Sequence, residues 1–182
     1  MEGGLFSNIK LIASDVDGVL TDSRKSYPME GQILSKSFCD LDTLGIKIAR
    51  YFGIHFVVVT GDNRINSNFA RLHKIDFLHT FKSKYDSLKE YIETNGWDIK
   101  DKEICYLGND LNDFDCIQKF FSVVPYKSTP EDISRYADCI FPDEPGFGFV
   151  RAVIDNILRD KGITIEDKFK ALQDLNKWNE KS

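Results

Sequence analysis

The 182-residue chain has only four cysteines, three histidines and no long apolar run. The cysteines form no C-x-x-C pair and their spacings fit no common zinc pattern, so we expect reduced, mostly buried thiols. No apolar run approaches the roughly 20 residues of a membrane-spanning helix, and no signal peptide is recognisable. These absences predict a cytoplasmic protein without a membrane partner.

Positive charge is scarce as well. The chain carries 24 Lys and Arg against 29 Asp and Glu, which gives a net charge of −5. Binding to nucleic acid needs a basic surface, so we expect no nucleic-acid partner. An acidic protein that binds an anionic substrate has to gather positive charge locally, through a metal ion or a few well-placed lysines and arginines.

The chain has no repeat, low-complexity tract or linker rich in Pro, Gly and Ser, so we expect a single domain over residues 1–182. Short apolar runs alternate with stretches of helical periodicity, which predicts an α/β fold. We expect a doubly wound, Rossmann-like parallel sheet with helices on both faces. The expected strands are 9–14, 55–60, 103–107, 121–124 and 139–141, and the expected helices are 44–51, 64–72, 84–94, 112–120, 130–136 and 149–158.

Two segments fall outside this alternation. Residues from about 23 to 38 have a turn-like Pro-Met-Glu-Gly centre between two runs that favour β structure, which predicts a hairpin inserted after the first strand. The tail from about 164 to 180 has apolar residues at helical spacing. We expect a helix there that packs on the domain or on a neighbouring subunit.

Two carboxylates, Asp15 and Asp17, directly follow the first expected strand. Carboxylates this close can converge on one hard cation such as Mg²⁺, which relieves their repulsion. Asp15 could then attack a phosphorus atom as a nucleophile, while Asp17 serves as general acid and base. Gly18 allows the chain to turn where a side chain would crowd a phosphate. Taken alone, the pattern also fits a solvated acidic loop.

Other polar residues follow the next strands. Thr60 and Gly61 end the second, and Asn109 and Asp110 follow the third. The carboxyl ends of parallel strands share one edge of the sheet, where ligands bind at a topological switch point. We therefore expect these residues to gather beside Asp15. Read separately, Thr60-Gly61 is an ordinary strand-ending turn and the Asn109 loop an Asx-rich helix cap.

The sequence D-V-D-G-V-L-T-D at 15–22 resembles motif one of the haloacid dehalogenase (HAD) superfamily. It is similar to the branch without a large cap domain, which contains 3-deoxy-D-manno-octulosonate 8-phosphate phosphatases, nonulosonate 9-phosphate phosphatases and domains fused to sialic-acid cytidylyltransferases. The resemblance covers roughly residues 8 to 160. It implies an Mg²⁺-dependent phosphatase that acts on a phosphorylated sugar or sugar acid through an aspartyl-phosphate.

The resemblance also implies roles for individual residues. Asp15, Asp17, Thr60 and Lys84 would be catalytic, with Lys82 as the competitor of Lys84 for the motif-three lysine. Thr60, Gly61 and Lys84 would also contact the phosphoryl group.

The metal would be held by Asp15, by Asp17 through its backbone carbonyl, and by Asn109 or Asp110. Asp113 would hold Lys84 by an ion pair, unless it only caps the next helix.

The chain departs from this branch at several positions. Asn109 stands where a carboxylate is usual, and arginines of the branch are missing at Asp62, at Phe147 and in the stretch 40–43. Lost arginines mean lost bidentate contacts to an anionic substrate. Asp42 and Arg64 remain as candidates for substrate binding, and octulosonate 8-phosphate itself is left open.

The resemblance further implies a homotetramer in which hairpins of neighbouring subunits cover the active sites. Asn109 and the missing arginines leave an alternative open, namely a non-catalytic HAD-like oligomerisation module associated with surface-sugar (sialic-acid-type) biosynthesis. A phosphoacceptor signalling domain is a third hypothesis, but a stable phospho-aspartate has no use for an adjacent acid/base such as Asp17.

Overall fold

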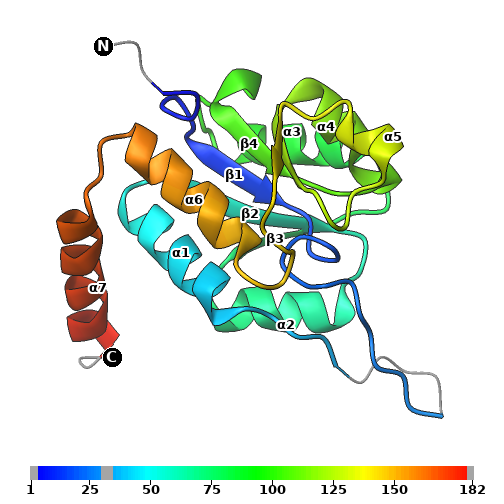
Figure 1. The fold of residues 1–182 in the computed structure, drawn as a ribbon, viewed down its shortest axis with the longest axis horizontal. Helices are drawn as coiled ribbons and strands as arrows, with labels where there is room; N and C mark the ends of the chain where they lie inside the picture. The colour runs from blue at the N-terminus through cyan, green and yellow to red at the C-terminus, as the bar shows by residue number, and fades with distance from the viewer. Residues whose placement is uncertain (1–3, 30–34, 180–182) are drawn as a thin grey trace.

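The computed structural model describes residues 4–29 and 35–179. Among these, six parallel strands form one sheet in the order β3-β2-β1-β4-β5-β6 (Figure 1). The strands are β1 (Leu11–Ser14), β2 (His55–Thr60), β3 (Asp76–His79), β4 (Ile104–Leu107), β5 (Phe121–Pro125) and β6 (Cys139–Phe141). The predicted doubly wound parallel sheet is confirmed, and the chain reverses its winding direction between β1 and β4.

Helices cover both faces of the sheet (Figure 1). One face packs on α1, α2 and α6, and the opposite face on α3, α4 and α5. Helix α7 lies beside α1, where the Tyr51 hydroxyl donates to Asp174 at 2.8 Å. The helices are α1 (Asp40–Tyr51), α2 (Arg64–Leu72), α3 (Lys84–Thr94), α4 (Phe114–Lys119), α5 (Glu131–Ser134), α6 (Phe149–Asp160) and α7 (Ile165–Asn179), with 3-10 turns η1 (Asp101–Glu103) and η2 (Leu111–Asp113).

Strand β1 shows why the strands were recognisable. Leu11 and Ala13 pack on the α3/α4 side and Ile12 on the α1/α6 side, and all three are fully buried. A strand covered on both faces needs apolar residues at every position, which produces the continuous apolar runs of the sequence. None of the helices in the described part of the chain is long and apolar enough to cross a membrane.

The insert between β1 and α1 is only partly described. Its two arms meet in one antiparallel bridge, in which the Ser26 amide donates to the Ser35 carbonyl at 3.4 Å. The tip of the expected hairpin, residues 30–34, lies outside the described residues. The whole segment between β1 and α1 is too short for a large cap domain, as predicted.

Helix α1 begins at Asp40, four residues earlier than expected. The stretch 40–43, predicted to contact substrate, therefore forms the first turn of this helix. The Asp42 side chain is buried and accepts the backbone N–H of Arg151 at 2.7 Å, in the first turn of α6. The Asp42 carboxylate thus supports the start of α6, and the substrate-binding role expected for it stays a prediction.

Asp42→Ala is expected to destabilise the protein by about 1–2 kcal/mol, because a buried acceptor at a helix N-terminus is lost. Asp42→Asn keeps an acceptor oxygen at the same place and should lose clearly less. Urea unfolding of both variants beside the wild type measures the difference. Equal losses for the two variants would contradict the role given to the Asp42–Arg151 hydrogen bond.

Candidate active site

A hollow of about 390 Å³ opens at the carboxyl ends of β1, β2 and β4, next to the switch point of the sheet. Its lining includes most of the residues that the motifs predicted: Asp15, Asp17, Thr60, Gly61, Asn109 and Asp110, together with Ser23, Lys25, Asp62 and Asn112. A larger hollow of about 480 Å³ lies along β3 and α3, but none of these carboxylates lines it. The strand ends, and not this larger depression, therefore locate the candidate site.

Lys84 is the lysine that meets Asp15. Its ammonium nitrogen lies 3.1 Å from Oδ1 of Asp15 and 2.7 Å from Oδ1 of Asp113, and all three side chains are buried. Lys82, the competitor from the sequence, is exposed. Burial and the nearby Asp113 charge raise the pKa of Asp15 to about 7, although Lys84 opposes this shift. Lys84 is thus the one cation in direct contact with the candidate nucleophile among the described residues.

Asp113 joins Lys84 to the loop after β4. One of its carboxylate oxygens accepts the Tyr106 hydroxyl at 2.6 Å and the Lys84 ammonium, and the other accepts the backbone N–H of Asn109 at 2.8 Å. The ion pair expected between Lys84 and Asp113 is therefore present, and Asp113 also caps η2 by accepting the Asp110 N–H. The sequence did not predict the contact of Tyr106 with Asp113, because a tyrosine inside an apolar strand is typical of a core residue.

The side chain of Asn109 offers an unpaired oxygen. Its Nδ2 donates to the Ser128 carbonyl at 3.2 Å, while its buried Oδ1 has no hydrogen-bond partner. Gly18 makes this approach possible, because a Cβ on it would lie 2.3 Å from Nδ2 of Asn109. An unsatisfied buried carbonyl costs free energy unless something binds it. An oxygen-seeking cation such as Mg²⁺ fits this position.

Asp110 is placed differently. Its side chain is exposed and accepts the Leu111 N–H at 2.7 Å, as the cap of η2. No three Asp, Glu, His or Cys side chains in the described part of the chain gather as metal ligands. The unpaired, buried Oδ1 of Asn109 fits a cation that Asp15 also contacts, whereas the exposed Asp110 carboxylate is bonded to the Leu111 N–H, which favours Asn109 over Asp110.

Thr60 presents a hydroxyl proton to the hollow. Its Oγ1 accepts hydrogen bonds from the Asp62 backbone N–H and from Nδ2 of Asn66, each at 3.2 Å. These two bonds occupy both lone pairs of the oxygen. The hydroxyl hydrogen is left for an acceptor in the hollow, such as a phosphoryl oxygen.

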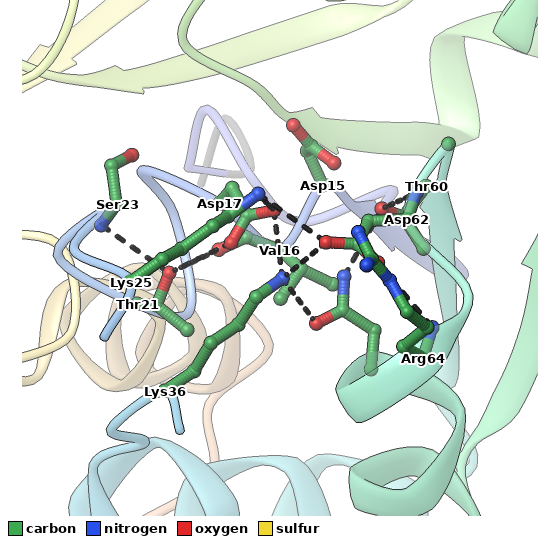
Figure 2. Close-up of polar contacts among 12 residues, drawn as sticks. Asp15, Val16, Asp17, Thr21, Ser23, Lys25, Lys36, Thr60, Asp62 and Arg64 are labelled. Atoms are coloured by element: carbon green, nitrogen blue, oxygen red, sulfur yellow. Dashed lines mark hydrogen bonds and ion pairs between the residues drawn. The ribbon is translucent and has the colours of Figure 1, made fainter. Parts of the chain in front are cut away.

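Asp17 takes part in a network that the sequence did not predict. Figure 2 shows Lys25 and Lys36 converging on Asp17 and Asp62, whereas the Asp15 carboxylate points away from them. Although burial raises the pKa of Asp62, the two lysines lower it to about 2. Lys25 and Lys36 lie on the two arms of the insert, and no local pattern marks them in the sequence.

The remaining predicted residues lie at the rim. Gly61 lines the hollow and also a second one that adjoins it, of about 430 Å³. Arg64 lines only this second hollow, where its exposed guanidinium lies 3.7 Å from Asp62. The structure therefore brings Arg64 near the site but not against Asp15, and Asp42 lines neither hollow.

A carboxylate paired with a buried lysine, beside a free amide oxygen and a hydroxyl donor, suits the handling of a phosphoryl group at the switch point of a doubly wound sheet. Fold and site together resemble those of α/β phosphatases of the HAD type. The comparisons with known proteins point the same way.

No protein-family model matches the chain. The chain is similar to the 3-deoxy-D-manno-octulosonate 8-phosphate phosphatase KdsC of Haemophilus influenzae, with 27% identity over 161 residues, which is 85% of this chain and 86% of that protein. It is 29% identical over 167 residues to KdsC of Escherichia coli K12, covering 91% and 87% of the two chains.

Solved structures agree. The octulosonate phosphatase of Moraxella catarrhalis, in complex with a magnesium ion, phosphate and KDO, aligns with a TM-score of 0.79 and 27% identity over 87% of this chain and 90% of that one. The cobalt-bound octulosonate phosphatase of Haemophilus influenzae aligns with a TM-score of 0.83 and 26% identity over 93% and 99%. The resemblance inferred from the motifs is confirmed: in sequence and fold, the chain resembles HAD sugar-phosphate phosphatases of the KdsC kind.

Lys84→Met should destabilise the protein by about 3–5 kcal/mol, because Asp15 and Asp113 are left as uncompensated buried anions. Lys82→Met is the matched control and should stay within about 0.5 kcal/mol of the wild type, since Lys82 is exposed. Denaturant unfolding at pH 8 in EDTA, above the pKa of about 7 of Asp15 and with no metal to compensate the negative charge, measures both. Similar losses in the two variants would argue against the buried ion triplet.

Asn109→Ala should weaken Mg²⁺ binding, and Asn109→Asp should strengthen it, since the two changes remove or add a ligand oxygen with charge. We expect about tenfold or more between the two variants, equivalent to 1.4 kcal/mol. Isothermal titration calorimetry at pH 8 measures this, because the pKa of Asp15 is about 7 and a proton on it competes with the metal. Equal affinities for both variants would remove Asn109 from the metal site.

Proposed function

We propose that the chain is a Mg²⁺-dependent phosphomonoester hydrolase acting on a phosphorylated sugar or sugar acid. The main support for this proposal is the position of the Asp15 carboxylate. It lies 3.1 Å from the Lys84 ammonium and lines the same hollow as Asn109, whose Oδ1 is unpaired. A nucleophile, a fixed positive charge and an oxygen ligand for a cation thus meet at one place. This combination suits phosphoryl transfer, which depends mainly on positioning and charge.

In the first step, an oxygen of Asp15 attacks the phosphorus atom and forms an aspartyl-phosphate. The phosphorus–oxygen bond to the sugar breaks, and Asp17 donates a proton to the departing sugar oxygen. Lys84 and the Thr60 hydroxyl stabilise the negative charge on the phosphoryl oxygens. A Mg²⁺ ion bound by Asp15, Asn109 and the Asp17 carbonyl would supply further positive charge and orient the phosphate.

In the second step, Asp17 takes a proton from a water molecule, whose oxygen attacks the phosphorus atom. The bond between phosphorus and Asp15 breaks, which releases inorganic phosphate and restores the carboxylate. Asp17 thus ends the cycle with the proton it needs for the next substrate. Asp17 lines the hollow and keeps about a quarter of its side chain exposed, so both the sugar oxygen and water have access to it.

The substrate is proposed by class. The relatives act on octulosonate 8-phosphate, but this chain has Asp62 and Phe147 where the resembling branch carries arginines. Besides Lys84, the positive groups near the hollow include Lys25, Lys36 and Arg64, and each of these three is paired with a carboxylate. We favour an octulosonate- or nonulosonate-like sugar phosphate whose distal groups need fewer bidentate contacts. The homotetramer and the cytoplasmic location stay predictions.

The alternative of a non-catalytic module keeps one supporting observation, since Asn109 replaces a charged ligand. Three buried ionic groups argue against it. Burying Asp15, Lys84 and Asp113 together is often no more stabilising than packing apolar residues there. A scaffold without catalysis has no need of this arrangement.

Phosphate release from a panel of phosphorylated sugar acids, heptoses and pentoses is expected with Mg²⁺ and absent with EDTA. Asp15→Asn should lower kcat/KM by about 10³-fold or more, because the nucleophile is lost. Asp132→Asn, on the exposed face of α5, is the matched control and should keep wild-type activity. The best substrate of the panel identifies the sugar class.

The outcomes separate the two functions. Turnover that survives in Asp15→Asn contradicts the aspartyl-phosphate route. A folded wild type that releases no phosphate from any member of the panel favours the non-catalytic module instead.

A further inference from the structure

The Lys36 side chain is fully buried, and its ammonium has three acceptors. Its nitrogen lies 2.9 Å from Oδ2 of Asp17, 3.0 Å from Oδ2 of Asp62 and 2.9 Å from Oδ1 of Asn66. An ammonium group has three N–H donors, so each donor has one partner. The three partners come from different segments: the loop after β1, the loop after β2, and helix α2.

Two of these contacts lead to groups that the proposed chemistry uses. Asp17, the acid and base of both steps, is contacted directly. Asn66 accepts from Lys36 through its oxygen and therefore directs its Nδ2 to the Thr60 hydroxyl at 3.2 Å. The Lys36 ammonium thus fixes the orientation of the Asp17 carboxylate directly and that of the Thr60 hydroxyl through Asn66.

The arm that carries Lys36 is itself anchored. Two residues further on, the ring of Phe38 stacks on Phe69 of α2, with ring centroids 3.9 Å apart and an interplanar angle of 6°. This stack places the backbone of the arm against α2. In Figure 2 the Lys36 side chain approaches Asp17 and Asp62 from the side opposite to the Asp15 carboxylate.

Lys25, on the other arm, provides a comparison. Its ammonium lies 3.2 Å from Asp17 and 3.3 Å from Asp62, but a quarter of the side chain is exposed. Lys25 lines the hollow, whereas Lys36 does not appear in its lining. The buried Lys36 can therefore hold the residues of the site in place, whereas the partly exposed Lys25 can contact a ligand in the hollow.

We propose that Lys36 is a positioning residue of the active site, which orients Asp17 for proton transfer to the leaving oxygen and, through Asn66, the Thr60 hydroxyl for the phosphoryl group. This inference rests on the proposed phosphatase function. On this proposal the insert contributes to the active site of its own chain, because Lys36 of the insert contacts Asp17, the proposed acid and base.

The two branches from Lys36 have different kinetic signatures. A sugar or alkyl oxygen is a poor leaving group and needs a proton from Asp17, whereas 2,4-dinitrophenolate leaves without one. The Asn66 branch acts on the phosphoryl group, which both kinds of substrate share. The ratio of kcat/KM for a sugar phosphate to kcat/KM for 2,4-dinitrophenyl phosphate therefore reports the Asp17 branch alone.

We expect Lys36→Met to lower this ratio at least about tenfold, towards the value for Asp17→Asn, for which the loss of a general acid predicts about 10²–10⁴-fold. Asn66→Ala should lower kcat/KM for both substrates to a similar extent and leave the ratio near the wild-type value. Lys36→Arg, which keeps the charge, should recover part of the ratio lost in Lys36→Met.

If Lys36→Met does not fold, Lys36→Met combined with Asp62→Asn removes one negative charge together with the positive one and carries the same expectation. If the folded Lys36 variant keeps the wild-type ratio of the two kcat/KM values, the role proposed for Lys36 is wrong, even if both activities fall. The proposed phosphatase function is not affected by that result. A wild type that turns over neither substrate overturns the proposed function, and the role of Lys36 with it.

Discussion

The contact on which the rest of the site depends is the buried Lys84 ammonium between Asp15 and Asp113. Two carboxylates this close in a protein interior repel each other strongly, and a cation between them is what allows both to be buried. The contact also ties three elements together, since Asp15 follows β1, Lys84 opens α3 and Asp113 follows β4.

A second cationic centre, Lys36, organises the opposite side of the hollow. The two lysines contact different groups of the proposed chemistry: Lys84 contacts Asp15, the proposed nucleophile, and Lys36 contacts Asp17, the proposed acid and base. This division keeps the two carboxylates in different surroundings although they are one residue apart.

Most of the fold could be predicted from the sequence, because parallel strands buried on both faces have continuous apolar sequences. The strand-end residues Asp15, Thr60 and Asn109 were found for the same reason, since parallel strands bring their carboxyl ends together. Local patterns failed where partners are distant in sequence. Lys36 and its acceptor Asn66 are 30 residues apart, and Asp42 reaches a helix more than 100 residues away. Helix α2 shows the effect on periodicity: its buried side includes Asn66 and Phe69, while the apolar Leu72 is 68% exposed.

The bridge between Ser26 and Ser35 has a consequence for the pairing register of the two arms. Lys25 and Lys36 are the residues next to the bridged pair on the domain side, so the register of the arms decides where both ammonium groups lie. Successive side chains of an extended strand point to opposite faces, and a slip of one residue would therefore turn an arm's lysine away from Asp17 and Asp62. The charge on this side of the hollow thus depends on a backbone register as well as on the identity of two residues.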